Sequence, residues 1–404
     1  MIPFLTLSYL PTVSGYWSLG KLMAVALGGF WLSFNSYRRD DSAMLGYLAI
    51  VLFSAVISTD PCTSLIGLHG TYNTGALCAV VLAPYWLGVS SSYRPTLQKQ
   101  VRFCSWLLAV SAALQLNGYF VGGGLPTGER VTGTMGSPVY LGALCALFWP
   151  LCGWRERVLL AGTLLATGSR GAWFAVAAAE VYERWPWWSP RKRLWAVVLA
   201  GAGMCAALTL RPPSDLGRVV TWAAAWEAFK AKPLFGWGVG NFYTVAEVFR
   251  NPAWVEAFGG TTQDHAHNLF LEAMATSGVI GLIALCILLY ALWRYSDRTA
   301  RSSLVAVGVV GFLNPLPMVV KAVALMVVAS SEHERLNIFD SEKSPKARMA
   351  FALSIACGVI CFWLVSLDRR VTNHGKYPWS FSSMEAAYDM GFLRFEKTRR
   401  DFKL

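Results

Sequence analysis

Long apolar stretches recur along almost the whole chain, and they limit the possible folds more than any other feature of the sequence. A helix of about 20 apolar residues crosses the hydrocarbon layer of a membrane, because its backbone groups bond to one another instead of to water. The stretches predict an all-α fold, a polytopic transmembrane helix bundle of about 11–12 spans. We place the spans at residues 16–33, 44–59, 72–90, 103–120, 135–152, 157–168, 171–183, 194–210, 267–293, 303–331 and 349–367.

The composition supports this class. Of 404 residues, 55% are hydrophobic and 14% are charged, which lies outside the range of soluble globular domains. The net charge of +12 comes from short basic clusters between apolar stretches, without a basic and aromatic face that could follow a nucleic-acid backbone. We therefore expect membrane lipids, and no nucleic acid, among the partners.

The basic clusters also set the predicted orientation. They occupy every second connection between the predicted spans, and Lys and Arg are retained on the cytoplasmic side. The alternate connections then face the periplasm. The predicted organisation is N-terminal transmembrane helices over 1–210, one large periplasmic loop with short helices over 211–266, C-terminal transmembrane helices over 267–367 and a basic tail over 368–404.

Helical periodicity continues inside the large loop. From Arg218 to Phe229 apolar residues recur at helical spacing, which predicts a helix along the membrane surface that ends at Lys232-Pro233. Its apolar positions are 219, 222, 226 and 229. We interpret the glycines that follow, at 236, 238 and 240, as turn residues.

Segment 303–331 contains Asn314-Pro315-Leu316-Pro317, where prolines remove backbone donors. It can form one long kinked helix or two short ones. The basic tail favours a cytoplasmic C-terminus, so we predict the single kinked helix. Lys321 then faces protein or a cavity.

His267 stands with Asn268 at the junction between the large loop and the span that follows. An imidazole titrates near neutrality and can accept a proton from an attacking hydroxyl, so His267 is the candidate general base. The alternative is a histidine that only caps the helix. His265 and His267, two residues apart with Asp264 adjacent, resemble a metal-binding cluster, but no third ligand with useful spacing is evident, so we expect no metal.

Arg170 lies between two predicted spans on the outer side, where the charge bias disfavours arginine. A guanidinium there can bind a phosphate or pyrophosphate through two parallel hydrogen bonds, and the alternative is a side chain that snorkels to lipid headgroups. Arg218 can add a second clamp or belong to a solvated face. Fixed cations beside a leaving pyrophosphate stabilise the transition state more than the ground state.

Four stretches, taken in order, resemble the O-antigen ligase and polymerase superfamily, GT-C-type membrane glycosyltransferases of the bacterial envelope. They run from Arg130 to Leu141, from Gly168 to Trp173, from Arg218 to Phe242 and from His265 to Gly281, within a core of about 125–295. The chain departs from the family at Ser137, where members often have Asn, and in having eight predicted spans before the large loop rather than nine.

The resemblance implies roles for residues of this sequence. His267 matches the catalytic base, and Arg170 and Arg218 match the arginines that bind the donor pyrophosphate. The residues expected to support the site are Asp264, His265, Asn268, Arg130 and Trp222. The family works without metal, nucleotide or other cofactor.

The implied function is transfer of a glycan from an undecaprenyl-pyrophosphate donor to an acceptor hydroxyl, with inversion, at the periplasmic face of the bacterial inner membrane. The acceptor is a lipid A-core sugar in a ligase, another repeat unit in a polymerase and a protein hydroxyl in an oligosaccharyltransferase. From another class, an envelope lipid transporter or flippase is disfavoured because only Lys21 and Lys321 lie mid-span and no internal repeat is evident.

Overall fold

A computed structural model describes residues 1–7, 16–33, 42–67, 75–87, 89, 93–119, 130–195, 198, 212–254 and 263–331. The predicted span 349–367, nearly all of 194–210 and the tail 368–404 lie outside these residues. The described part is built of helices without a strand, so the all-α prediction is confirmed. The helices are α1 (Ile2–Leu7), α2 (Tyr16–Ser33), α3 (Ser42–Val56), α4 (Pro61–Ile66), α5 (Ala76–Leu87), α6 (Arg94–Leu116), η2 (Gly133–Met135), α7 (Pro138–Phe148), η3 (Trp149–Leu151), α8 (Trp154–Thr167), α9 (Arg170–Arg184), η4 (Trp185–Trp187), α11 (Pro212–Ala231), α12 (Phe242–Phe249), α14 (Leu269–Tyr295), α15 (Arg298–Leu313) and α16 (Met318–Ala329).

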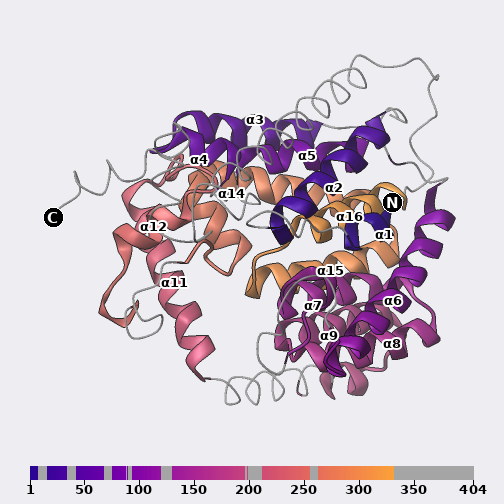
Figure 1. Ribbon diagram of the computed structural model, residues 1–404. Helices are drawn as coiled ribbons and strands as arrows, with labels where there is room; N and C mark the ends of the chain where they lie inside the picture. The colour runs from indigo at the N-terminus through magenta and orange to yellow at the C-terminus, as the bar shows by residue number, and fades with distance from the viewer. Residues whose placement is uncertain are drawn as a thin grey trace.

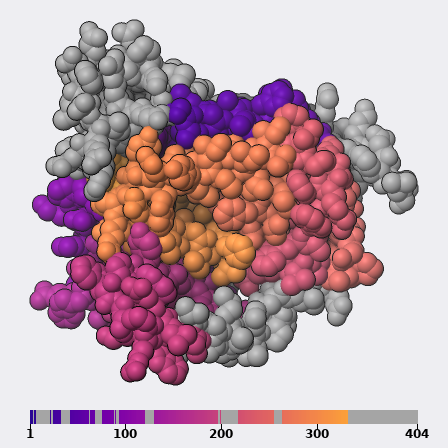
Figure 2. Space-filling model, turned by 180° about the vertical axis from the view of Figure 1, so that it is seen from behind, coloured from indigo at the N-terminus to yellow at the C-terminus, as the bar shows by residue number. Residues whose placement is uncertain are grey.

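The last helices of the described part lie at the centre of the bundle. In Figure 1, α15 and α16 separate the group α6–α9 from the group α2, α3 and α5. α15 packs along α9, α16 packs along α5, and α14 packs along α3. Seen from behind, the orange surface of α14–α16 is continuous between the indigo and magenta helices (Figure 2). Apolar side chains such as Leu141, Leu144 and Phe148 of α7 are fully buried in the shared core.

Contacts between helix termini define two ends of the bundle. At the end that we call the site end, Val131 N–H donates to Ala166 O near the end of α8. Arg218 of α11 donates there to Leu313 O at the end of α15. At the other end, which we call the ion-pair end, Arg94 begins α6 and contacts Asp297, the N-cap of α15.

α15 and α16 form an antiparallel pair, so the prediction of one kinked helix over 303–331 is wrong. The backbone N–H of Asp297, just before α15, donates to Ser331 Oγ, just after α16, at 3.3 Å. Arg94 Nη1 donates to Val327 O near the end of α16 while its other nitrogen contacts Asp297. Two prolines within four residues reverse the chain at 314–317 instead of bending one helix.

α14 alone among the described helices is long and apolar enough to cross a membrane by itself. It has 27 residues, and its most apolar window has a mean hydropathy of 2.3. Shorter apolar helices lie at Ser42–Val56, Ala76–Leu87, Pro138–Leu151 and Met318–Ala329. α8 and α9 are real helices of 14 and 15 residues, as the short predicted spans 157–168 and 171–183 suggested.

The helix predicted from Arg218 to Phe229 lies within α11, which ends just before Lys232 as expected. Its buried face differs from the predicted one. Small residues (Val220, Ala224, Ala225 and Ala228) face the protein, whereas Val219 and Trp226 are at least half exposed. The alanines allow α11 to approach α14 and α12 closely, while Val219 and Trp226 point outward.

Lys21 has a structural role in the N-terminal part of the chain. Its ammonium group is buried and donates to the carbonyls of Leu5 and Thr6, at the end of the short helix α1. Helix-terminal carbonyls lack intrahelical partners, so a buried lysine there satisfies both groups. This contact explains why a charged residue interrupts the apolar sequence of α2.

Candidate functional site

A glycine-rich junction joins the segment after α11 to the middle of α14. Gly278 interrupts α14 with φ 65° and ψ −166°, a conformation open almost only to glycine. Trp237 and Gly238 donate backbone N–H groups to Ala275 O and Thr276 O, and Val279 donates to Pro233 O. The junction therefore satisfies the backbone groups that the interrupted helix leaves open.

The turn glycines allow this close approach. A Cβ on Gly236 would lie 2.4 Å from the carbonyl carbon of Thr276, and one on Gly278 would lie 2.2 Å from Leu234 O. Gly236, Gly238 and Gly240 all have positive φ, which confirms them as turn residues. The third and fourth stretches of the family resemblance are thus in direct backbone contact.

Asn268 fixes the start of α14. Its side chain accepts hydrogen bonds from Phe270 N at 2.9 Å and Leu271 N at 3.1 Å, so it caps the helix. Ala266, two residues before Asn268, is held by two helices. Its N–H donates to Glu272 Oε2 of α14 at 3.0 Å, and its carbonyl accepts from Thr221 of α11 at 3.4 Å. Asn268 thus supplies the cap, which leaves His267 available for another role.

His265 is buried and paired with acidic groups. Its Nδ1 lies 3.1 Å from Glu272 Oε1, and its Nε2 lies 3.7 Å from Asp264 Oδ2. Burial opposes the charged form, but the charges of Glu272 and Asp264 outweigh it and raise the pKa of His265 to about 9. At neutral pH His265 is therefore an imidazolium and cannot accept a proton.

His267 has the opposite character. Burial, together with the positive charges of His265 and Arg218, lowers its pKa below the ordinary 6.5. It is the one non-glycine residue with positive φ, at 55°, in the described ranges, and such a conformation costs about 1–3 kcal/mol. His267 is therefore neutral at pH 7 and can act as a base. The two histidines differ in protonation state as well as in their position in the sequence.

Arg218 is anchored to the turn between α15 and α16. Its Nε donates to Leu313 O at 3.2 Å, and Nη2 donates to Asn314 Oδ1 at 3.2 Å. One turn further along α11, Trp222 packs edge-on against Phe312, with ring centroids 6.2 Å apart. The structure thus places Trp222 beside Arg218, and its buried Nε1 has no hydrogen-bond partner in the described part of the chain.

Arg130 and Arg170 lie at the turn between α8 and α9. Arg130 donates to Thr167 O at 2.8 Å and to Gly168 O at 3.4 Å, which ties the segment before α7 to the end of α8. Arg170 is the first residue of α9 and is half-buried. The next residue, Gly171, faces the Asn314 amide. Asn314 therefore lies between the helix of Arg218 and the helix of Arg170.

Four residues at the site end were not predicted as site residues. Glu272 and Asn314 make the contacts described above. Tyr140 of α7 lies within electrostatic range of Asp264 and Glu272, and Lys321 of α16 lies within range of His265 and Glu272. Glu272 follows the Asn268 cap by one helical turn, a spacing that the sequence displays. The other positions depend on tertiary packing.

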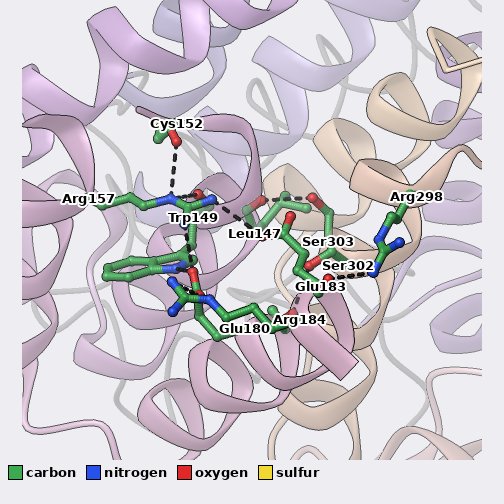
Figure 3. Close-up of polar contacts among 11 residues, drawn as sticks. Leu147, Trp149, Cys152, Arg157, Glu180, Glu183, Arg184, Arg298, Ser302 and Ser303 are labelled. Carbon is green, nitrogen blue, oxygen red and sulfur yellow. Dashed lines mark hydrogen bonds and ion pairs between the residues drawn. The ribbon is translucent and has the colours of Figure 1, made fainter. Parts of the chain in front are cut away.

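The ion-pair end carries a cavity of about 510 Å³, lined by Trp149, Trp154, Arg157, Glu180, Val181, Arg184 and Trp188. None of the predicted site residues lies there. Glu180 is the centre of the network drawn in Figure 3, with contacts of 2.6 Å to the Trp149 indole and 2.7 Å to both Arg157 and Arg184. At this end Arg157 and Arg184 contact a carboxylate, and Arg157 also donates to the backbone carbonyls of Trp149 and Cys152.

The protein is thus a helical bundle that carries a neutral histidine, a protonated histidine and several arginines at one end. Residues 157–286 match the family model described as O-antigen ligase. The matched segment runs from α8 into α14 and includes Arg170, Arg218 and His267. It confirms the resemblance to the O-antigen ligase and polymerase superfamily, whose members are glycosyltransferase-like integral inner-membrane proteins that act on lipid-linked glycans. No curated protein matches the chain.

Proposed function

We propose that the chain is a metal-independent inverting glycosyltransferase of the O-antigen ligase type. It transfers a glycan from an undecaprenyl-pyrophosphate donor to the hydroxyl of a lipid A-core sugar. The same site chemistry serves a polysaccharide polymerase or a protein O-oligosaccharyltransferase, which differ only in the acceptor. The observation that carries the proposal is the presence of a neutral, half-buried His267 within electrostatic range of Arg218, inside the segment that matches the family.

In the proposed mechanism His267 accepts the proton of the acceptor hydroxyl as that oxygen attacks the anomeric carbon of the donor. The bond between that carbon and the pyrophosphate oxygen breaks, and the electron pair leaves with undecaprenyl pyrophosphate. Attack from the face opposite the leaving group inverts the anomeric carbon. Arg170 and Arg218 bind the pyrophosphate, whose charge grows as the bond breaks.

The proposed location is the bacterial inner membrane, which the chain crosses several times with the site end facing the periplasm. α14 has the length and apolarity for one crossing. Basic residues gather at the ion-pair end, where Arg94, Arg157, Arg184 and Arg298 lie at helix termini. Lys and Arg near span ends favour the cytoplasm, which leaves the site end for the opposite face.

The test replaces His267 with Ala in a strain whose surface glycan depends on this gene. We expect the glycan ladder to disappear while the protein remains in the membrane. Lys230→Ala, at an exposed ion pair with Glu227 on α11, is the matched control and should leave the ladder unchanged. An unchanged ladder in the His267 variant would exclude the proposed base.

Purified protein in detergent separates transfer from transport. Incubation with the glycan-linked donor and an acceptor should release undecaprenyl pyrophosphate, because the bond to the sugar breaks. A transporter or flippase breaks no bond and releases none. Mass spectrometry of the attachment point of the glycan, in strains with and without the gene, then identifies the acceptor.

A further inference from the structure

Asn314 occupies a buried and restricted position at the end of α15. It is 4% exposed, and its backbone N–H donates to Val310 O at 2.8 Å. Its backbone is extended, with φ −155° and ψ 158°. Pro315 follows, and a residue before proline is confined to extended conformations. The backbone that carries the Asn314 amide is therefore restricted.

The two faces of that amide meet two different helices. Asn314 Oδ1 accepts a hydrogen bond from Arg218 Nη2, while the neighbouring Leu313 O accepts one from Arg218 Nε. On the other side, a Cβ placed on Gly171 would lie only 2.9 Å from Asn314 Nδ2. Gly171 follows Arg170 directly, so the Asn314 side chain lies between Arg218 of α11 and the first turn of α9.

We propose that Asn314 is a positioning residue that sets the distance and orientation of the Arg218 guanidinium relative to the first turn of α9, where Arg170 lies. The inference rests on the proposed function, because it concerns how these arginines bind a pyrophosphate. A neutral amide orients the guanidinium without cancelling its charge, whereas a carboxylate would compete with the phosphate. The Asn-Pro-Leu-Pro turn is thus part of the donor site.

The test measures binding of undecaprenyl pyrophosphate, without glycan, to the full chain purified in detergent. Asn314→Ala should weaken binding about tenfold, because a hydrogen bond to a charged group is lost. The same substitution in an Arg218→Gln background should have no further effect, since the two residues act as a unit. Unchanged binding in Asn314→Ala, or an equal loss in both backgrounds, would overturn the inference.

Two further variants separate positioning from simple support of the fold. Asn314→Asp keeps an acceptor for Arg218 but adds a negative charge, so it should lose binding like Asn314→Ala while its melting temperature stays near that of wild type. Gly171→Ala should displace the amide from the opposite side and weaken binding. Gly308→Ala on α15, where a Cβ meets open space, is its matched control. Full binding by Asn314→Asp would show that Asn314 only supports the fold and does not position Arg218.

The outcome for wild-type protein distinguishes the two levels of proposal. Wild-type protein that does not bind undecaprenyl pyrophosphate overturns the proposed function and this inference together. Wild-type protein that binds it, with Asn314→Ala and Gly171→Ala unaffected, overturns the inference alone and leaves the proposed function standing.

Discussion

The two ends of the bundle hold their arginines in different ways. At the ion-pair end, Arg157 and Arg184 contact the carboxylate of Glu180, and Arg157 also lies over the Trp149 ring. At the site end, Arg130 and Arg218 donate to backbone carbonyls and to an amide oxygen. A neutral acceptor orients a guanidinium without itself adding a negative charge, whereas a carboxylate forms an ion pair with it.

We propose that this difference separates contacts that stabilise the fold from contacts that bind the donor. Carboxylate pairs between α8 and α9 hold helices together at the ion-pair end (Figure 3). The site end carries a capped helix start and a histidine with positive φ beside the arginines that we propose bind the donor. We therefore expect substitutions at one end to change mainly folding, and substitutions of charged residues at the other to change mainly activity.

The largest expected effect comes from the backbone of the site end. Gly278→Ala should lower the free energy of unfolding by about 3 kcal/mol or more, because the new Cβ meets Leu234 O in a backbone region that only glycine tolerates. Size-exclusion chromatography of heated, detergent-solubilised protein measures the loss. Gly162→Ala on α8, where a Cβ meets open space, is the control. Equal melting of the two variants would contradict the described junction.

An intermediate effect is expected at the ion-pair end. Glu180→Gln should lower the free energy of unfolding by about 1–3 kcal/mol, since Arg157 loses its nearest carboxylate in a partly buried network. Glycan transfer per folded molecule should stay unchanged. Glu227→Gln, in an exposed ion pair, serves as control in the same melting and transfer assays. A loss of glycan transfer in Glu180→Gln without a loss of stability would contradict the expectation that the ion-pair end affects mainly folding.

The smallest effect is a shift in titration. Arg218→Gln should raise the pKa of His267, because the charge of Arg218 is one of the causes that lower it. NMR of the labelled histidine side chains measures this in purified protein, with Lys230→Gln as control. In wild type, activity should fall as the pH drops through the pKa of His267, below 6.5, because the protonated form is no base. An unmoved pKa in Arg218→Gln would mean that the arginine charge is already cancelled.

Much of the fold could be predicted because apolar length and charge bias are local properties of the sequence. The helix predicted at 16–33 coincides with α2, and the span predicted at 267–293 begins two residues before α14. The reversal at 314–317 was missed because a proline pair permits both a kink and a turn, and the choice depends on packing against Arg94. The face of α11 was missed because large apolar residues outweighed the alanines that actually pack.

The candidate site could be predicted in part for the same reason. The position of His267 at the start of a predicted span and the position of Arg170 between two predicted spans can be read from the sequence alone. The protonation difference between His265 and His267 is not, because it depends on Glu272 lying one helical turn beyond the cap and on Arg218 approaching from another helix. Asn314 was beyond reach, since the contact joins residues 96 positions apart.

The interruption of α14 at Gly278 also has a consequence for the order in which the chain assembles. Ala275 O and Thr276 O find their partners in Trp237 and Gly238, which precede them by 38 residues in the chain. An open carbonyl in hydrocarbon costs several kcal/mol, so an apolar environment tolerates the interruption at Gly278 only while Trp237 and Gly238 supply these two donors. The interrupted form of α14 therefore arises only once the preceding glycine segment has folded back onto it.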